Sequence, residues 1–339
     1  MQRYSLSEIG RNVGVSASTV SRVLNGVAGV NEATRRKVLS AVQEANSRPG
    51  VAQATRTHRR LIGFLMPAEA EQWGIHTNFT EQGLSAIRAV AADFKYAAIV
   101  GSYHPRLRDK AEDEMIENLE FAGALLFRTG DELHDSEPFR KRGIPFLIVN
   151  RLLPGTSLNY IGPDHLKVGF TAAEHLLKCR YRRIGLLAGN RRYVSHRLYQ
   201  QGFENAHAAA GQAVDPAMVT EIELNVEGGF EGTRRLMELS PRPDALVVSS
   251  DRASLGCMKA LADLRIKVPR DIGVLALDGT RETAFSHPPL TAVEIPWYDM
   301  LALGTKLLIE MIEQRPPIEQ IGICCSTQLV IRGSTAQKH

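Results

Sequence analysis

From Leu61 to its end, the chain alternates between short apolar runs and longer amphipathic stretches, and this alternation constrains the fold most strongly. Apolar runs separated by helical stretches are typical of parallel sheets that helices cover on both faces. Because roughly 280 residues are too many for a single sheet, we expect two lobes. The predicted strands are 61–66, 97–100, 124–127, 145–149, 184–187, 245–248 and 274–277. The predicted helices between them include 80–93, 109–119, 167–177 and 253–264.

Residues 1–60 carry an excess of positive charge that the rest of the chain lacks. Ten Lys or Arg and three Glu give this segment a net charge of +7, whereas the remainder has 31 basic and 34 acidic residues. A basic segment attached to a mildly acidic body is typical of a module that binds a polyanion. A solvated basic surface is the alternative.

The same segment predicts two short helices joined by a three-residue turn. A capping box opens the first helix, and Gly14 is placed to end it in the left-handed conformation. Ser16 is placed to cap a second helix over 17–25, and a third helix is expected to begin at Asn31 or Glu32. Two short helices across such a turn, with a third packed behind them, form a helix-turn-helix.

The exposed face of the second predicted helix is small and polar. Small side chains let a helix approach base edges and phosphates closely, and one Arg can donate two hydrogen bonds to guanine O6 and N7. We therefore predict that this face contacts double-stranded DNA. A surface salt bridge is the alternative for the arginine. The face consists of Ala17, Ser18, Ser21, Arg22 and Asn25.

The stretch SLSEIGRNVGVSASTVSRVLNG, followed by VNEATRRKV, resembles the DNA-binding head of the LacI/GalR (lactose-repressor) family of bacterial transcription regulators. GVSxxTVSRVLN and TRxKV carry the resemblance. It implies that the second helix enters the major groove, with Ala17 and Ser18 discriminating the sequence and Arg22 reading a base. The other implied DNA-binding positions are Leu6, Ser7, Ser16, Thr19, Ser21, Asn25, Asn31 and Thr34.

Residues 48–60 are predicted to be a hinge linker, because they are basic, poor in large apolar residues and interrupted by Pro49-Gly50. In the family this segment folds on DNA and inserts a leucine into the minor groove, which kinks the duplex. Here the leucine position falls on Thr55 or Arg56, which predicts a weaker kink or a different hinge contact. The implied hinge contacts are Val51, Ala52, Thr55 and Arg56.

The rest of the chain resembles the effector-binding core of the same family, which has the periplasmic sugar-binding-protein fold. RRIGLLAG, SSDRASLG, RIKVPRDIGVLALD and HPPLTAVEIP carry this resemblance. It implies an α/β core of two lobes, with parallel sheets covered on both faces, and an all-α helix-turn-helix head. The expected domains are 1–47 for DNA binding, 48–60 for the hinge and 61–339 for effector binding and dimerisation. Within the last, lobe 1 is expected over about 61–161 plus 298–313, and lobe 2 over about 162–290 plus the C-terminal segment.

Candidate ligand residues follow the predicted strands, because ligands bind such sheets beyond the carboxyl ends of the strands. The resemblance assigns Asp251 to the effector, and a carboxylate accepts from two neighbouring sugar hydroxyls; capping of the next helix is the alternative. Asp164 is equally suited to capping and to ligand binding, and Asp278 to ligand binding or a turn. The aromatic candidates, with core packing as the alternative, are Phe79 and Trp297.

Four further residues are candidates for contacting the effector, and two of them bear on its charge. Ser195 matches a position that contacts the effector in the family. The usual arginine of the family's cleft falls on Tyr199, and Arg197 is a candidate substitute. Arg128 follows another predicted strand. Together, Arg128 and Arg197 indicate an acidic effector such as a sugar acid or sugar phosphate, bound through paired contacts to the guanidinium groups. Surface positions for both arginines are the alternative.

Other classes of protein are less consistent with the sequence. It lacks GxGxxG after a strand, GxxxxGK[ST], GxSxG and HExxH, and its ten His are scattered, so no enzyme, cofactor, catalytic residue or metal site is expected. The four Cys lack CxxC spacing and are expected as buried free thiols. No apolar run approaches ~20 residues and the first residues do not resemble a signal peptide, so we expect no membrane partner and a cytoplasmic, nucleoid-associated location.

Together these features predict a sequence-specific DNA-binding transcription regulator, with repression as its expected action. A homodimer is expected on a near-palindromic operator, controlled by a sugar or an acidic sugar derivative bound between two lobes. The alternatives are a regulator with a non-sugar corepressor such as a nucleobase, a cytoplasmic α/β enzyme with a DNA-binding head, and a nonspecific DNA-binding protein. Induction and corepression fit the sequence equally.

Overall fold

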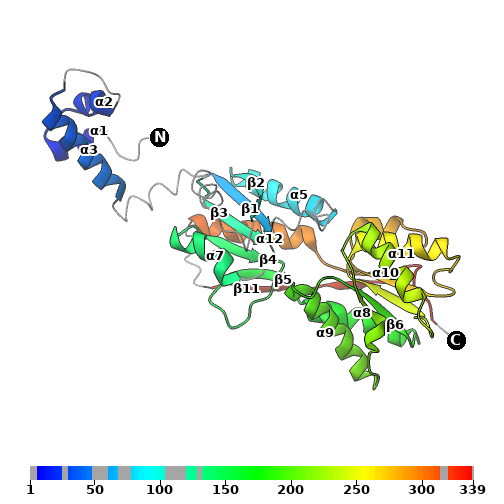
Figure 1. Cartoon of the computed structure of the whole chain (residues 1–339). Helices are drawn as coiled ribbons and strands as arrows, with labels where there is room; N and C mark the ends of the chain where they lie inside the picture. The colour runs from blue at the N-terminus through cyan, green and yellow to red at the C-terminus, as the bar shows by residue number, and fades with distance from the viewer. Residues whose placement is uncertain are drawn as a thin grey trace. The chain divides into compact units, whose positions relative to one another are not determined.

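The computed structural model describes residues 6–24, 30–47, 60–67, 78–103, 120–127, 132–313 and 320–337. The chain divides into two compact units, Met1–Arg60 and Leu61–His339 (Figure 1). Among the described residues, no helix combines the length and apolarity that crossing a bilayer requires.

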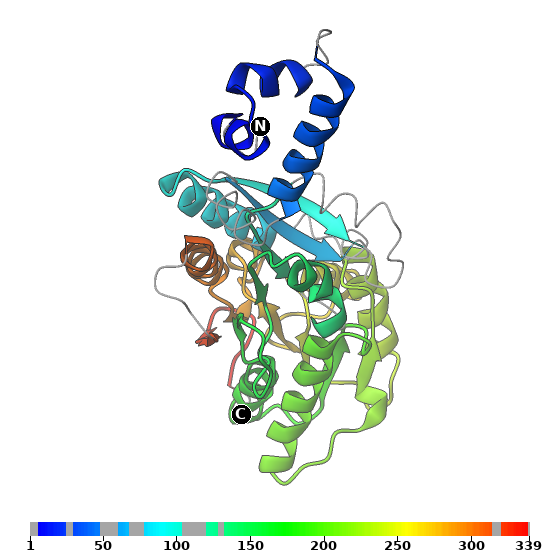
Figure 2. The same ribbon diagram turned by 90° about the vertical axis from the view of Figure 1, so that its left-hand side faces the viewer.

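The described residues of the first unit form three helices, α1 (Leu6–Val13), α2 (Ala17–Leu24) and α3 (Glu32–Ser47), coloured blue in Figure 2. Gly14 has a φ of 76°, a left-handed conformation that glycine adopts at little cost, and it ends α1 as predicted. The helices bury one apolar cluster of Ile9, Val20, Val23 and Val38. The helix-turn-helix prediction is therefore confirmed, and α2 matches the predicted helix over its described residues, 17–24.

The second unit contains two six-stranded sheets, which define lobe 1 and lobe 2. The sheet of lobe 1 has the strand order β11-β5-β4-β3-β1-β2, and all its pairs are parallel. Its strands are β1 (Leu61–Pro67), β2 (Ala97–Tyr103), β3 (Gly123–Phe127), β4 (Phe146–Val149), β5 (Tyr160–Pro163) and β11 (Gly322–Cys325). Its helices within the described ranges are α5 (Asn78–Asp93), α7 (Glu132–Lys141) and α12 (Trp297–Glu313).

The sheet of lobe 2 has the strand order β12-β10-β9-β8-β6-β7, and only β12 runs antiparallel to its neighbour. Its strands are β6 (Ile184–Ala188), β7 (Val219–Glu221), β8 (Ala245–Val248), β9 (Gly273–Asp278), β10 (Thr291–Glu294) and β12 (Gln328–Val330). Its helices are α8 (His165–Lys178), α9 (Val194–Ala209), α10 (Val226–Met237) and α11 (Asp251–Asp263), with short 3₁₀ turns η2 (Pro216–Met218) and η3 (Arg281–Phe285).

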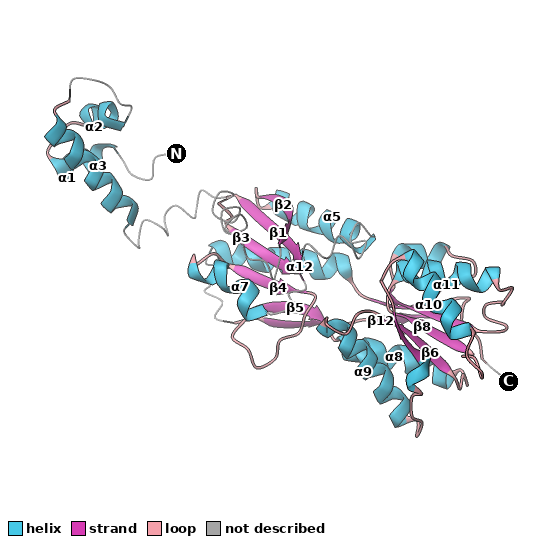
Figure 3. Cartoon of the chain, in the orientation of Figure 1, coloured by secondary structure: helices cyan, strands magenta, loops and turns pink. Residues whose placement is uncertain are grey.

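Helices cover both faces of the lobe 2 sheet, as expected for uninterrupted apolar strands (Figure 3). Alternate residues of β8 point into the two clusters: Val247 packs with α8 and α9, and Val248 packs with α10 and α11. The backbones of α8 and α9 meet closely, because a Cβ on Gly202 would lie 1.9 Å from the Leu166 oxygen. This close packing sets the position of α9, which carries several candidate site residues.

The chain passes between the two sheets after β5, after β10 and after β11. The expected lobe boundaries therefore need two changes. β10 lies beyond the expected end of lobe 2 and pairs with β9 in that lobe. The C-terminal segment, expected wholly in lobe 2, divides: β11 pairs with β5 of lobe 1, and β12 pairs with β10 of lobe 2. Backbone pairing between distant segments decides this division, and no local pattern encodes it.

The predicted strands all occur, with ends shifted by up to three residues. The predicted helices 80–93, 167–177 and 253–264 correspond to α5, α8 and α11. The predicted helix 109–119 lies outside the described residues.

Candidate functional sites

The amino end of α2 is organised by hydroxyl groups. The Thr19 N–H donates to Ser16 Oγ at 3.2 Å, so the predicted cap is confirmed. Ser16 Oγ also lies 2.8 Å from Ser18 Oγ and 2.9 Å from Thr19 Oγ1. These contacts hold small polar side chains on the first turn of the helix.

The buried and exposed sides of α2 are clearly separated. Val20 and Val23 are buried, whereas Ser18 and Arg22 are exposed. Ser18 and Arg22 are four residues apart and therefore lie on the same side of the helix. The remaining predicted contacts on this helix, which are half-exposed, are Ala17, Thr19 and Ser21.

Helix α3 of the same unit also begins with a polar cap. Asn31 Oδ1 accepts a hydrogen bond from the Thr34 N–H at 2.7 Å, which marks Asn31 as the cap of α3. The Asn31 backbone oxygen also accepts from the Arg35 N–H at 3.0 Å, so Asn31 holds the first turn of α3 through both its side chain and its backbone.

Several predicted residues cannot be placed. Leu6 and Ser7 lie in α1 and Phe79 lies in α5, but their side chains are outside the described part of the structure. The residues that lie wholly outside the described ranges are Asn25, Val51, Ala52, Thr55, Arg56 and Arg128.

In the second unit, Asp251 joins two strand ends. It is the first residue of α11, just after β8, and is 7% exposed. Its carboxylate accepts from the N–H of Gly279 at 3.3 Å and from the N–H of Thr280 at 2.5 Å. The alternative that Asp251 caps its own helix is wrong, because Ser250 occupies the N-cap position. The side chain instead ties the start of α11 to the turn after β9.

The carboxylate of Asp278 affects the pKa of Asp251. Burial raises the pKa of Asp251 well above its ordinary value, and the negative charge of Asp278 raises it further. Asp278 ends β9 with a φ of 90°, a conformation that side chains other than glycine and asparagine rarely adopt. Two like charges and an unusual backbone at the carboxyl ends of adjacent strands form an electrostatically costly arrangement, which is common in binding sites.

Asn150 was not among the predicted site residues, although it follows β4. It is 4% exposed and has a φ of 63°. Its backbone oxygen accepts from His165 Nε2 at 3.0 Å, while its Oδ1 finds no donor within the described ranges. The rule that selected Asp251, a polar residue after a buried strand, would have selected Asn150 as well.

A chain of rings begins at His165 and joins the two lobes. The rings of His165 and Tyr199 meet edge to face with centroids 5.0 Å apart. His196 lies 5.9 Å from Tyr199, and Tyr193 lies 6.1 Å from His196. Tyr193, from lobe 2, packs against the core of lobe 1 that contains Trp297. Tyr199 is buried, so an aromatic ring lies where the family resemblance places an arginine.

Trp297 occupies a core position at the start of α12. It is buried, and its ring lies 6.3 Å from that of Phe127. Core packing, the alternative weighed for Trp297, is thus what the structure contains; one edge of a buried ring can still contact a ligand.

Arg197, the candidate substitute for the cleft arginine, holds the loop before α9. It is exposed, and its Nη1 donates to the backbone oxygens of Arg191 at 2.7 Å and Arg192 at 3.1 Å. Ser195 is buried in the first turn of α9. Asp164 caps α8 by accepting from the Lys167 N–H at 3.0 Å, which confirms its capping alternative.

Metal and thiol chemistry find little support. Within the described ranges, no group of His, Cys, Asp and Glu has a geometry suited to a metal ion. The four cysteines are free, and burial raises the pKa of Cys257 to about 12. The prediction that all four are buried holds only for Cys257, since Cys179 and Cys325 are half-buried. Cys324 is exposed because β11 is an edge strand whose residues alternate in exposure.

Each of the two units matches a known protein family. Residues 5–50 match the family of bacterial regulatory proteins of the lacI type, and residues 173–335 match the periplasmic binding protein-like domain. A helix-turn-helix head joined to such a core defines a class of protein, the DNA-binding transcription regulators with a ligand-binding-type core.

A curated relative narrows this class. An uncharacterized HTH-type transcriptional regulator in the aml 5′ region of Streptomyces limosus is 31% identical over 98% of this chain and 94% of that protein. The chain therefore belongs to the LacI family of bacterial regulatory proteins, and it is a DNA-binding transcription regulator.

Solved structures share the fold over nearly the whole chain. The lac repressor dimer bound to operator and the anti-inducer ONPF has a TM-score of 0.69 and 25% identity, covering 98% of this chain and 99% of that one. A complex of the transcriptional regulator CelR with cellobiose has a TM-score of 0.72 and 24% identity, with the same coverage. The predicted family and the predicted α/β fold with a helix-turn-helix head are both confirmed.

Proposed function

We propose that this regulator represses transcription by binding, as a homodimer, to a near-palindromic operator, and that a neutral sugar controls the binding. The DNA-binding part of this proposal is supported by the polar outer side of α2, where Ser18 and Arg22 are exposed on a helix that Ser16 caps. Ser18 and Ala17 would discriminate bases by close approach, and Arg22 would pair with guanine.

Two heads are required because one head has few base-reading side chains. The second unit offers surfaces through which two copies could associate. Val100 on edge strand β2, Leu255 on α11 and Phe285 on η3 are large apolar side chains that are 48%, 40% and 75% exposed. A pocket of about 770 Å³ between α5 and β2 would receive side chains of a partner. The lac repressor, which shares this fold, forms a dimer on its operator.

The proposed effector site lies at the strand ends marked by Asp251, Asp278 and Asn150. These side chains offer carboxylate and amide oxygens, which accept hydrogen bonds from hydroxyl groups. The two carboxylates would repel an anion, and Arg197 already serves the loop before α9. These observations favour a neutral sugar over a sugar acid or sugar phosphate.

In this proposal the sugar is bound and released unchanged, and the protein has no enzymatic activity. The sugar changes operator affinity only if it binds the DNA-competent and DNA-incompetent forms unequally. The ring chain from His165 to Tyr193 connects the lobes and is suited to transmit such a difference. Action on an operator implies a cytoplasmic, nucleoid-associated location.

The test has two arms. Selection of duplexes from a random library is expected to yield a two-fold symmetric sequence, and the absence of any enriched sequence would contradict the proposal. Titration with cellobiose, maltose, glucose and glucose 6-phosphate, followed by thermal denaturation, is expected to raise the melting temperature with one or more neutral sugars. Stabilisation by glucose 6-phosphate alone would favour the acidic effector instead.

A further inference from the structure

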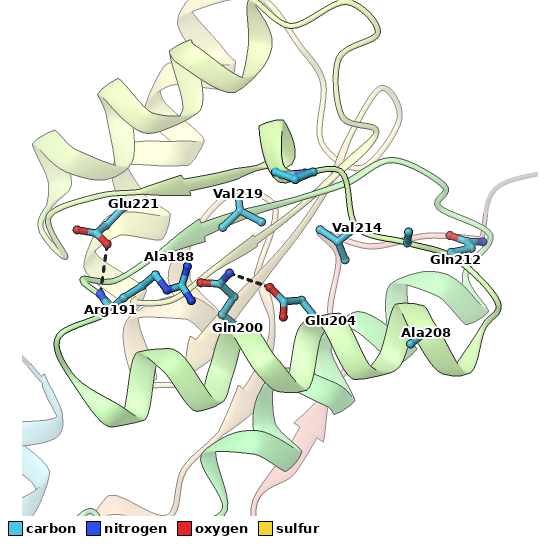
Figure 4. A pocket seen from close by; sticks show the side chains of 11 residues that line it. Ala188, Arg191, Gln200, Glu204, Ala208, Gln212, Val214, Val219 and Glu221 are labelled. Atoms are coloured by element: carbon cyan, nitrogen blue, oxygen red, sulfur yellow. Dashed lines mark hydrogen bonds between the residues drawn. The ribbon is translucent and has the colours of Figure 1, made fainter.

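A pocket in lobe 2 lies away from the proposed effector site. It has a volume of about 640 Å³ and lies between α9, the edge strand β7 and the segment 212–216 (Figure 4). The proposed effector residues of lobe 2, Asp251 and Asp278, lie at the ends of β8 and β9, which are interior strands of the same sheet, whereas β7 is its last strand. The pocket is therefore a separate feature of the outer edge of the lobe.

The sequence of α9 opens this pocket. Gln200, Glu204 and Ala208 are spaced by four residues and so line the same side of the helix. The methyl side chains of Ala188 and Ala208 leave space that larger residues would fill. Val214 and Val219 supply an apolar wall opposite the helix (Figure 4).

Gln200 contributes an unusual polar group to the pocket. It is 9% exposed, and its Nε2 donates to Glu204 Oε1 at 2.8 Å. The carboxylate fixes the orientation of the amide, because the opposite orientation would place two oxygens together. Gln200 Oε1 then finds no donor among the described residues. A buried acceptor in this state is costly, so a ligand that donates a hydrogen bond there would bind favourably.

The charged groups of the pocket indicate what kind of donor fits. Glu204 and Glu221 carry two negative charges and Arg191 carries one positive charge. Glu221 also accepts from the Arg191 backbone N–H at 3.2 Å, at one end of the pocket (Figure 4). An amide oxygen whose neighbouring residue is the carboxylate of Glu204, next to an apolar wall, matches a cationic donor on a short aliphatic chain.

We propose that this pocket binds a primary ammonium group carried on a short aliphatic chain. The ammonium donates to Gln200 Oε1 and to the carboxylate of Glu204, and the chain packs against Val214 and Val219. Such a group belongs either to a free aliphatic amine or to an amino acid, whose carboxylate would face Arg191. This site is independent of the sugar proposed above.

The test uses the full-length protein and three compounds that share one aliphatic skeleton. Isoamylamine carries the ammonium alone, L-leucine adds a carboxylate, and isovalerate has the carboxylate without the ammonium. Dissociation constants come from saturation-transfer difference NMR titrations. Isoamylamine or L-leucine is expected to bind at least about tenfold more tightly than isovalerate. Binding of L-leucine alone identifies the amino acid as the source, and binding of both identifies the ammonium group as sufficient.

Two variants assign the binding to this pocket. Gln200→Met removes the acceptor at similar size and is expected to weaken binding about tenfold, whereas Gln201→Met, on an exposed neighbour outside the pocket, leaves it unchanged. Glu204→Gln, at an exposed position that does not threaten folding, is expected to weaken it as well. Asp278→Asn is expected to leave ammonium binding unchanged while it weakens sugar binding.

The proposal is overturned if neither ammonium compound binds or if isovalerate binds equally well. Loss of ammonium binding in Asp278→Asn, or unchanged binding in both Gln200→Met and Glu204→Gln, would equally overturn it.

Discussion

The DNA-binding head and lobe 2 achieve stability in different ways. Among its described residues, the head buries one cluster, Ile9, Val20, Val23 and Val38, within three helices that are close together in the chain. Lobe 2 buries clusters on both faces of a sheet, and its strands come from residues as far apart as Ile184 and Val330. A small unit depends on each core side chain more than a large one does, because it buries less of its surface. The head is therefore expected to be the less stable of the two, and to unfold under conditions in which lobe 2 remains folded.

The largest expected effect tests this contrast directly. Val20→Ala removes two methyl groups from the head's only described core, at a cost of about 2 kcal/mol. Because a small domain has little stability to lose, DNA binding is expected to fall at least a hundredfold at 37 °C while the main calorimetric transition is unchanged.

The matched control is Val274→Ala, which makes the same change in the fully buried core of lobe 2. It is expected to lower the main transition while leaving DNA binding intact at 20 °C. If Val20→Ala lowered the main transition as much as Val274→Ala, the two units would not be independent.

The second prediction separates base reading from folding within the head. Arg22→Ala removes a paired contact worth about 1–3 kcal/mol in each head, so affinity for the selected operator is expected to fall at least tenfold. Affinity for random duplex is expected to change less. Fluorescence anisotropy with both duplexes measures the difference, with Arg36→Ala, an exposed arginine on α3, as control. Equal losses on the two duplexes would mean that Arg22 serves charge alone.

The third prediction concerns the paired carboxylates of lobe 2. Burial is the main reason that the pKa of Asp251 is raised, and Asp278→Asn removes the second cause, the neighbouring negative charge. Asparagine tolerates the positive φ at this position. The variant is expected to be more stable than the wild type by about 1 kcal/mol at pH 7 and to bind sugar more weakly.

The pH dependence of that gain has a defined sign. The pKa of Asp251 is higher in the folded than in the unfolded protein, so its contribution to stability is full below the unfolded pKa and is lost as pH rises through the folded pKa. The advantage of Asp278→Asn is therefore expected to be small at pH 3 and to grow toward pH 7, as measured by urea denaturation. A pH-independent difference would exclude the repulsion as its cause.

The smallest expected effect distinguishes a loop tie from a ligand contact. Arg197→Ala removes two hydrogen bonds to backbone oxygens in the loop before α9, at a cost of about 1 kcal/mol. Sugar binding is expected to change less than about threefold by this mechanism. If isothermal titration showed that the variant loses more than a hundredfold in sugar affinity, Arg197 would instead contact the effector directly.

Much of the molecule was predictable from local patterns. The caps at Ser16 and Asp164 depend on a side chain and a backbone N–H only three residues away, so sequence spacing predicts them. The interior strands such as β8 were predictable because burial on both faces requires an uninterrupted apolar run. Five strands were missed, the edge strands β7, β11 and β12 and the interior strands β5 and β10. Each has only three or four residues and lacks the uninterrupted aliphatic run of β8, so its periodicity is too weak to recognise.

The helix-turn-helix, the alternation of strands and helices, and the family could all be inferred from the amino-acid sequence, because each depends on neighbouring residues or on recognisable motifs. The tertiary structure alone decided that the C-terminal segment is shared between the lobes and that Asp251 binds the turn after β9. The tertiary structure also places α9 beside the edge strand β7, with the pocket that Gln200 lines between them. These features join residues that are far apart in the chain, and backbone pairing and packing bring them together without a local signal.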